Sequence, residues 1–316
     1  MNLSAGMAFQ ILQSLLVVLA APLLMGWVNQ CRAWLQNRSA PSILLPYFTL
    51  AKLFHKDAVI ARNASPLFRI TPYVLFGCMW LAAGIVPVLA TDLPFAPAAD
   101  IIALVGVFAL ARVFSALAAM DIGTSFGGLG ARREMLIGFL AEPAMLMTLF
   151  TAAFISGSTH LPTIVDTLAH RQFAIYPSLA FAAVAFLMVL LAENARIPID
   201  NPTTHLELTM VHEAMILEYS ARHLALVEWA MAIKLFAYMT IGIALFLPWG
   251  IAEAGDWAAL PVAVAALALK LAFAGAGLSF LETLLAKLRL FLAPEFLSTA
   301  FLLAVLGMLT HFLTRA

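Results

Sequence analysis

Long apolar stretches constrain the fold of this chain more than any other feature of its sequence. A helix needs about 20 apolar residues to cross the hydrocarbon core of a bilayer, which is about 30 Å thick. Eight such stretches occur, at about residues 7–27, 72–90, 100–119, 138–156, 174–192, 225–247, 258–280 and 295–312. Only 11% of the residues are charged, against about 25% in soluble domains. The sequence therefore excludes a soluble globule and predicts an all-α, polytopic integral membrane protein with about eight transmembrane helices.

No linker, low-complexity tract or internal repeat divides the sequence, so we expect one transmembrane domain over residues 1–316. The hydrophilic connections are expected at about 28–71, 120–137, 193–224 and 281–294. Secondary transporters often contain inverted repeats with broken helices in matching halves. The polar segments of this chain are unequal, which disfavours a stand-alone transporter.

Basic residues fall mainly in alternate loops. The loop after the first span carries six of them: Arg32, Arg38, Lys52, Lys56, Arg62 and Arg69. The loops after the third, fifth and seventh spans carry two each: Arg132 and Arg133, Arg196 and Arg222, Lys287 and Arg289. The other loops carry only Arg171, and the C-terminal tail carries Arg315. Because cytoplasmic loops hold the excess of Lys and Arg, we expect these four loops in the cytoplasm and both termini on the outer side.

The overall charge and the cysteines exclude other kinds of site. Lys plus Arg and Asp plus Glu both total 17, so no net positive field attracts nucleic acid. Cys31 and Cys78 lie far apart, which excludes an iron–sulfur cluster or a structural zinc held by this chain alone. His212-Glu213 does not continue to the second histidine of HExxH, because position 216 holds Ile216. We therefore expect no metal and no cofactor in this chain.

Five acidic residues are concentrated in the most polar stretch of the sequence: Glu193, Asp200, Glu207, Glu213 and Glu218. Asn201-Pro202, followed by capping-box spacing from Thr204, predicts that a helix begins here. One interpretation is a cytoplasmic helix whose carboxylates face water. However, apolar residues alternate so closely with these acids that no broad polar face exists, so several carboxylates must be buried. Burial beside other acids raises the pKa of a carboxyl toward the range of proton exchange, so this stretch is a candidate proton relay.

A second polar segment, DIGTSFGGLGARREM, runs from Asp121 to Met135, and LAEP follows at residues 140–143. Its glycines lack the GxGxxG spacing of a dinucleotide site, so we expect them to allow close backbone approach. Glu134 and Glu142 are spaced so that both can lie on one side of a helix. A carboxylate within the membrane is a candidate functional residue. For Glu134 the alternative is a salt bridge with a neighbouring arginine, either Arg132 or Arg133.

Further charged residues fall within predicted spans or just beyond the end of one: Arg112, Glu228, Lys234, Lys270 and Glu282. None is expected to face lipid, because an unpaired charge at the bilayer centre costs at least about 2.5 kcal/mol. Glu228 and Lys234, near the start of the sixth span, can extend to the interface. Lys270 lies in mid-span and needs a polar partner or a water path. Arg112 can pair with Asp100 across the third span, in a structural or a functional role.

Several runs together resemble one family over nearly the whole chain: DIGTSFGGLGARREM, LAEP, ENARIPIDNPTTHLELTMVHEAMILEYS, and AKLRLF followed by PEFL. The sequence resembles the membrane subunit of formate hydrogenlyase and related group 4 NiFe hydrogenases. That subunit is homologous to NADH dehydrogenase subunit 1 of respiratory complex I. The runs HLELTMVHEAM and DIGTSFGG favour the hydrogenase type.

The resemblance implies a non-catalytic anchor in a prokaryotic inner membrane that couples electron transfer to proton or sodium movement. It implies four partners: a NiFe large subunit, a small iron–sulfur subunit, a ferredoxin-like subunit and an antiporter-like membrane subunit. The NiFe centre and iron–sulfur clusters belong to those partners. The implied ion-coupling residues are Glu134, Glu142, Glu193, Asp200, Glu207, Glu213 and Glu218. Arg196 is their implied ion-pair partner, while Arg112, Lys234 and Lys270 are ion-pair or structural candidates.

The sequence also departs from the family pattern. In PSILLPYFTLAKLF, Leu45 and Thr49 stand where relatives carry a Gln and an Asp, which weakens a polar quinone-headgroup site. Ala221 stands where relatives often have Gly after Glu-Tyr-Ser, and Leu292 where they often have a base. The alternative function, a quinone-site subunit of a complex I-like NADH dehydrogenase, is therefore disfavoured.

Overall fold

The computed structural model describes residues 3–91, 93–170, 177–196, 210–252, 257–286 and 292–315. Eight long helices account for the predicted spans one for one: α1 (Leu3–Leu35), α3 (Pro66–Ile85), α4 (Ile101–Asp121), α5 (Ser125–Ser156), α7 (Pro177–Glu193), α9 (Ala221–Phe246), α10 (Leu260–Leu284) and α11 (Ala293–Arg315). Among the described residues, seven of these are long and apolar enough to cross a membrane, and α7, with 17 residues, is shorter. The predicted all-α, polytopic membrane fold is confirmed.

Short helices connect the long ones: α2 (Leu45–Phe54), the 3-10 helix η1 (Ala96–Ala98), α6 (Leu161–His170) and α8 (His212–Ile216). The main difference from expectation is at residues 120–137, which we expected to form a loop. Most of this segment is helical, because α5 begins at Ser125 with the Thr124 side chain accepting a hydrogen bond from the Gly127 N–H.

The glycines of this segment allow close backbone approach, as the sequence predicted. A Cβ atom added at Gly127 would lie 2.4 Å from the carbonyl oxygen of Ala119. One added at Gly130 would lie 2.8 Å from the carbonyl oxygen of Val211. The start of α5 therefore packs closely against both the end of α4 and the segment before α8.

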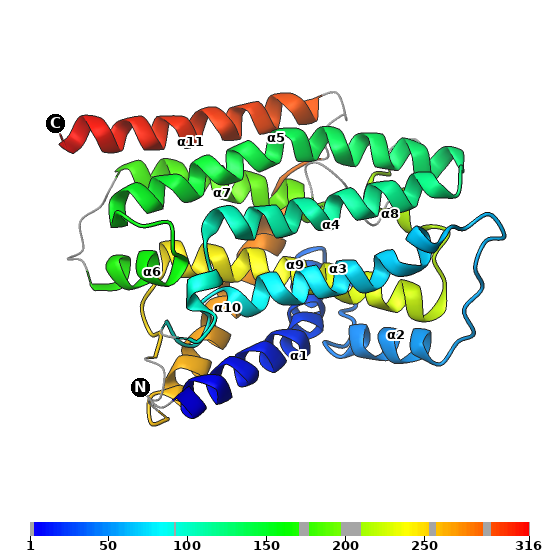
Figure 1. The fold of residues 1–316 in the computed structure, drawn as a ribbon, viewed down its shortest axis with the longest axis horizontal. Coiled ribbons are helices and arrows are strands. Elements are labelled where there is room, and N and C mark those ends of the chain that lie inside the picture. Colours follow the sequence, from blue (N-terminus) through cyan, green and yellow to red (C-terminus); the bar gives the residue numbers. More distant parts are fainter. Residues whose placement is uncertain are drawn as a thin grey trace.

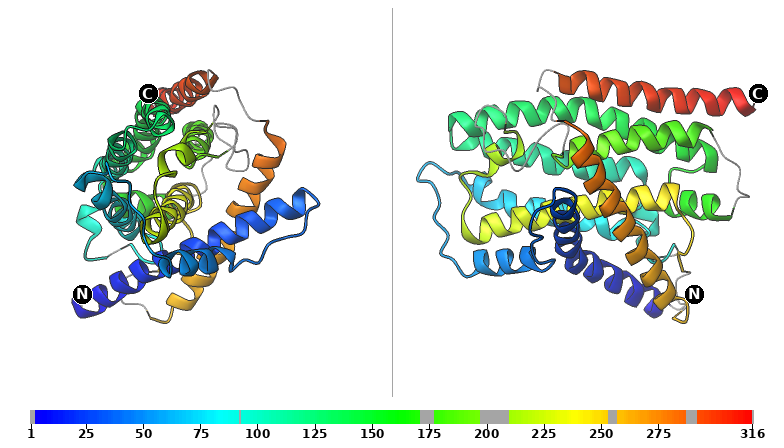
Figure 2. Two further views of the ribbon diagram at one scale, coloured as in Figure 1. Left: turned by 90° about the vertical axis from the view of Figure 1, so that its right-hand side faces the viewer. Right: turned by 180° about the vertical axis from the view of Figure 1, so that it is seen from behind.

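Most of the long helices run side by side, whereas α1 and α10 pack on each other and cross the rest obliquely (Figures 1 and 2). Both chain ends lie at one end of the bundle, and the connection between α2 and α3 lies at the other (Figure 1). Helix α9 is the most buried span, with 72% of its apolar window inside the protein. It packs against α1, α3 and α7, among others, and so forms the centre of the bundle.

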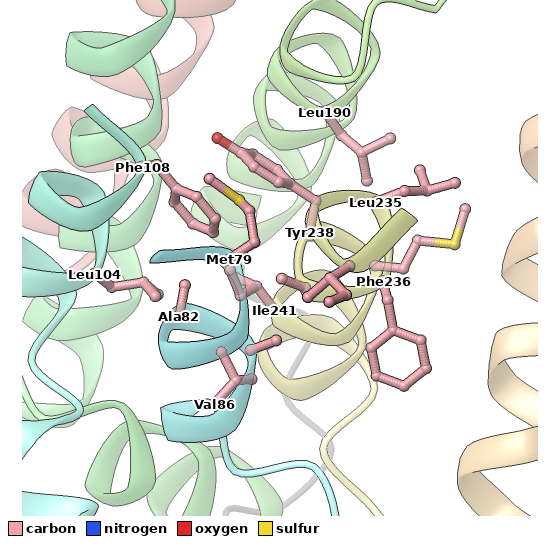
Figure 3. Close-up of a cluster of buried hydrophobic side chains, with 14 of the residues drawn as sticks. Met79, Ala82, Val86, Leu104, Phe108, Leu190, Leu235, Phe236, Tyr238 and Ile241 are labelled. Atoms are coloured by element: carbon pink, nitrogen blue, oxygen red, sulfur yellow. The ribbon is translucent and has the colours of Figure 1, made fainter. Parts of the chain in front are cut away.

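The core around α9 is apolar and aromatic. Tyr238 of α9 points toward Phe108 of α4, with ring centroids 4.9 Å apart, and Leu190 of α7 belongs to the same cluster (Figure 3). Met79 and Ala82 of α3 fill the same space and are buried. This packing holds α3, α4, α7 and α9 in fixed register, which positions the charged side chains that lie further along the same helices.

Candidate functional site

The most highly charged part of the protein interior is centred on Arg112 of α4. Its guanidinium donates hydrogen bonds to the carboxylates of Glu142 on α5 and Glu193 at the end of α7. Its Nε also lies 3.7 Å from Oε1 of Glu134, which is on α5. Lys234 of α9 completes the group, with its Nζ 3.0 Å from Oε2 of Glu193. We refer to these five residues as the Arg112 cluster.

The Arg112 cluster combines three carboxylates with two cations, so it carries one surplus negative charge when all members are ionised. The side chain of Glu193 is only 2% exposed, whereas that of Glu142 is 34% exposed. Buried charges persist when they are paired and hydrogen-bonded. Within the cluster the acids outnumber the cations, and the exposed fraction of the side chain increases from Glu193 to Glu142.

A second buried group is centred on Glu282 of α10. Oε1 of Glu282 lies 3.2 Å from Nη1 of Arg196, and its Oε2 lies 3.6 Å from Nη1 of Arg32 on α1. Arg196 follows α7 after Ala195, whose φ of 49° turns the chain through the left-handed region. We refer to Glu282, Arg196 and Arg32 as the Glu282 cluster, and it ties α10 and α1 to the segment after α7.

A cavity of about 410 Å³ lies between the two clusters. Glu193 and Lys234 of the Arg112 cluster contribute to its wall, as do Arg196 and Arg32 of the Glu282 cluster. Most of the cavity wall is apolar, and the charged side chains of the two clusters supply much of its polar part. Both clusters therefore face one space, which is large enough to hold water molecules.

A sequence profile of the NADH dehydrogenase family matches residues 8–313, almost the whole chain. The chain belongs to this family. It is 31% identical over 287 residues to formate hydrogenlyase subunit 4 of Escherichia coli, covering 91% of this chain and 92% of that protein. It is 33% identical over 300 residues to hydrogenase-4 component C of Escherichia coli, covering 95% of this chain and 94% of that protein.

A solved structure supports the same fold. The chain superposes on a subunit of the membrane-bound sulfane sulfur reductase, an archaeal respiratory membrane complex, with a TM-score of 0.79 and 20% identity. The match covers 95% of this chain and 98% of that one. This member of the NADH dehydrogenase family is therefore a multi-pass membrane subunit of a complex I-like complex, as the sequence motifs predicted.

The structure brings together only some of the carboxylates that the family resemblance implied. Glu134, Glu142 and Glu193 meet at Arg112, and Glu213 lines the cavity. Glu218 is exposed after α8 and is not part of the cavity wall. The short helix α8 ends at Ile216, two residues before Glu218. Asp200 and Glu207 lie outside the described residues.

One expected pairing was wrong, and another residue has a partner that the sequence did not suggest. Among the described residues, Arg196 pairs with Glu282. Asp100 does not pair with Arg112; it accepts hydrogen bonds from the Ile102 N–H and the Thr159 hydroxyl and caps α4. Glu282 and Thr159 are distant in sequence from the residues that they contact, so no local pattern could assign these two partners.

Both lysines of the predicted spans have polar partners inside the protein. Lys234 does not extend to the interface but turns inward to Glu193. Glu228, for which the interface was also suggested, lines the cavity. Lys270 has the polar partner that its mid-span position required. Its Nζ donates a hydrogen bond to the carbonyl oxygen of Leu247, 2.6 Å away, and another to the carbonyl oxygen of Trp249. It therefore satisfies carbonyls beyond the end of α9.

Sequence reasoning did not select Glu282 as a site residue, although its position just beyond the end of a predicted span was the signal that could have done so. In the parts of the chain that the structure describes, no group of three His, Cys, Asp or Glu side chains could hold a metal ion.

Proposed function

We propose that this chain is the non-catalytic membrane-anchor and ion-coupling subunit of a formate hydrogenlyase-like or energy-converting NiFe hydrogenase complex. It links a peripheral electron-transfer arm to the translocation of protons or sodium ions. The observation that carries the proposal is the Arg112 cluster, whose surplus carboxylate lies inside the bundle and whose Glu193 and Lys234 face the cavity.

The free-energy cost of burying charged side chains supports a coupling role over a purely structural one. Apolar residues of similar volume often stabilise a protein as well as a buried ion pair does. Holding α4, α5, α7 and α9 together through five charged residues costs more desolvation free energy than apolar packing would. They are well suited to a site whose proton occupancy changes when the helices shift.

The proposed complex supplies the redox chemistry on other chains. We assign the NiFe centre and iron–sulfur clusters to a NiFe large subunit, a small iron–sulfur subunit and a ferredoxin-like subunit, with an antiporter-like subunit alongside in the membrane. The hydrogenase-type names of the two Escherichia coli relatives support this assignment. The location of both chain ends at one end of the bundle is consistent with termini on the outer side of a prokaryotic inner membrane.

Membrane vesicles that contain the assembled complex test the coupling role. Glu142→Gln should reduce ion uptake driven by the redox reaction by about tenfold, because it removes the exposed acid of the cluster. Hydrogen oxidation with a soluble dye should stay within about twofold of the wild type, since that chemistry lies elsewhere. Glu295→Gln, at an exposed position in the first turn of α11, is the matched control. Unchanged ion uptake in Glu142→Gln would remove this residue from the coupling path.

Purification tests the assembly. A tagged copy of the chain, isolated in mild detergent, should bring down a NiFe large subunit and iron–sulfur proteins. Recovery of the chain without them would refute the proposed complex.

The size of the cavity keeps one alternative open to test, a quinone-site subunit of a complex I-like NADH dehydrogenase. Leu45 and Thr49 line the cavity, so the departures seen in the sequence fall on its wall. A bulky side chain in Thr49→Trp should abolish quinone reduction if a quinone occupies this space. On our proposal the complex reduces no quinone, and redox-driven ion uptake does not depend on added quinone.

A further inference from the structure

Gly138 occupies a special place in the Arg112 cluster. It lies on α5 midway between Glu134 and Glu142, four residues from each. Residues four apart in a helix lie close together on one face. Gly138 is therefore flanked, above and below, by two of the three carboxylates that contact Arg112.

The guanidinium of Arg112 occupies the space that a side chain at position 138 would need. A Cβ atom added to Gly138 would lie 2.4 Å from Nη1, 2.5 Å from Cδ and 2.7 Å from Nε of Arg112. Non-bonded carbon atoms pack at about 3.5–4.0 Å. Any residue other than glycine would therefore displace Arg112 or push α4 away from α5.

Arg112 has little freedom to move aside. A long side chain on a protein surface can give way easily, but that of Arg112 is only 5% exposed. Its two terminal nitrogens are bonded to different helices, Nη1 to Glu142 of α5 and Nη2 to Glu193 of α7. A shift that relieved a clash at position 138 would break at least one of these charge-assisted bonds.

We propose that Gly138 is a positioning residue for ion coupling: the absence of a side chain there forms a notch that seats the Arg112 guanidinium between the α5 carboxylates and Glu193. Glycine is unfavourable in a helix interior, and this notch gives its presence in α5 a physical reason. The inference rests on the proposed coupling role of the Arg112 cluster.

Gly138→Ala in the assembled complex tests the notch. We expect redox-driven ion uptake in vesicles to fall by about tenfold. The added methyl group occupies the space of the Arg112 guanidinium, which therefore cannot keep all of its ion pairs. Gly128→Ala on α5 and Gly106→Ala on α4 are matched controls, since a Cβ at either position meets nothing within 4 Å. Both controls should stay within about twofold of wild type.

A double-mutant cycle separates this role from simple packing. In an Arg112→Ala background the Cδ, Nε and Nη1 atoms that the added methyl group would meet are absent, so adding Gly138→Ala should no longer lower the unfolding temperature of the purified chain. An equal fall in unfolding temperature in both backgrounds would show that the methyl group acts on the backbone, and would overturn the proposal. If Gly138→Ala prevents assembly, Arg112→Ala should restore recovery of the large subunit, and failure to restore it would likewise overturn the proposal.

The outcomes also separate this inference from the function on which it rests. If Glu142→Gln and Glu193→Gln both leave ion uptake intact, the proposed function fails. If those changes impair uptake and Gly138→Ala does not, only the role of Gly138 fails.

Discussion

The Arg112 guanidinium on α4 pairs with the Glu193 carboxylate at the end of α7, 81 positions later in the sequence. Lys234 of α9 contacts the other oxygen of the same carboxylate. Glu193 therefore joins three helices through a single side chain. A displacement of any one of them changes the charges that face this carboxylate, which is what a coupling site needs if helix movement is to change proton occupancy.

Removing the charge of Glu193 should destabilise the protein more than removing that of Glu142. Breaking a buried ion pair costs about 3–5 kcal/mol, because the partner is left with an uncompensated charge. Glu193 has two cationic partners and is buried, whereas a third of the Glu142 side chain is exposed. Thermal unfolding of the purified chain in detergent should show a larger shift for Glu193→Gln than for Glu142→Gln. Equal shifts would contradict this ranking.

Lys234 and Glu193 should show energetic coupling. Lys234→Met leaves the Glu193 carboxylate with one cation fewer and should destabilise the protein by up to about 3–5 kcal/mol, the cost of breaking a buried ion pair. Adding Glu193→Gln removes the unbalanced charge, so the double variant should lose less stability than the sum of the two single changes. The same thermal unfolding measurement on all four proteins gives the coupling. Strict additivity would mean that the 3.0 Å contact contributes nothing.

The helices were predictable from sequence because a bilayer demands long apolar stretches, and α1, α4 and α9 supply them. The early start of α5 was not predicted, since a run rich in glycine is typical of a loop. Only the close contacts of Gly127 and Gly130 with other backbone segments explain why it is helical here. Helix propensity is a weak guide where tertiary packing decides.

The candidate site was predictable in part for a similar reason. The cost of burying Arg112 in a membrane requires partners, but the sequence does not say which carboxylates approach it. Two of them, Glu142 and Glu193, are 30 and 81 positions away. Arg196 and Glu282 are 86 positions apart, so their pairing also depends on how α10 packs.

Asp100 should make stability depend on pH in the acid range. A hydrogen bond from the Thr159 hydroxyl, and a further one from the Ile102 N–H, lower the pKa of the Asp100 carboxyl below its usual value. A lowered pKa in the folded state gives stability that is present above the ordinary value, about 3.9, and is lost as the pH falls through the folded value.

Two substitutions at position 100 separate the cap from the charge. Asp100→Ala should cost about 1 kcal/mol at neutral pH, because α4 loses its N-cap. Asp100→Asn keeps a capping oxygen, so it should lose little stability at neutral pH and should remove the decline below about pH 4. Thermal unfolding at pH 3 and pH 7 measures both. If Asp100→Asn loses as much stability at pH 3 as the wild type does, the loss at low pH comes from other carboxyl groups.

Ala221→Gly should stabilise the protein, although it shortens a buried side chain. Ala221 begins α9 with a φ of 48°, a left-handed conformation that costs an L-residue about 1–2 kcal/mol. Glycine avoids this cost, but the loss of one buried methyl group lowers stability by about 0.8 kcal/mol. We therefore expect a net gain of about 0.5 kcal/mol, seen as a higher unfolding temperature.

A second alanine on the same helix supplies the control for this change. Ala225 is also buried, and it lies within α9, where glycine is unfavourable. Ala225→Gly should therefore destabilise the protein by about 1 kcal/mol or more. The opposite signs of the two substitutions are the diagnostic result, because a general effect of glycine in α9 would lower stability at both positions. A loss of stability in Ala221→Gly would mean that the buried methyl group contributes more than the strain of the left-handed backbone costs.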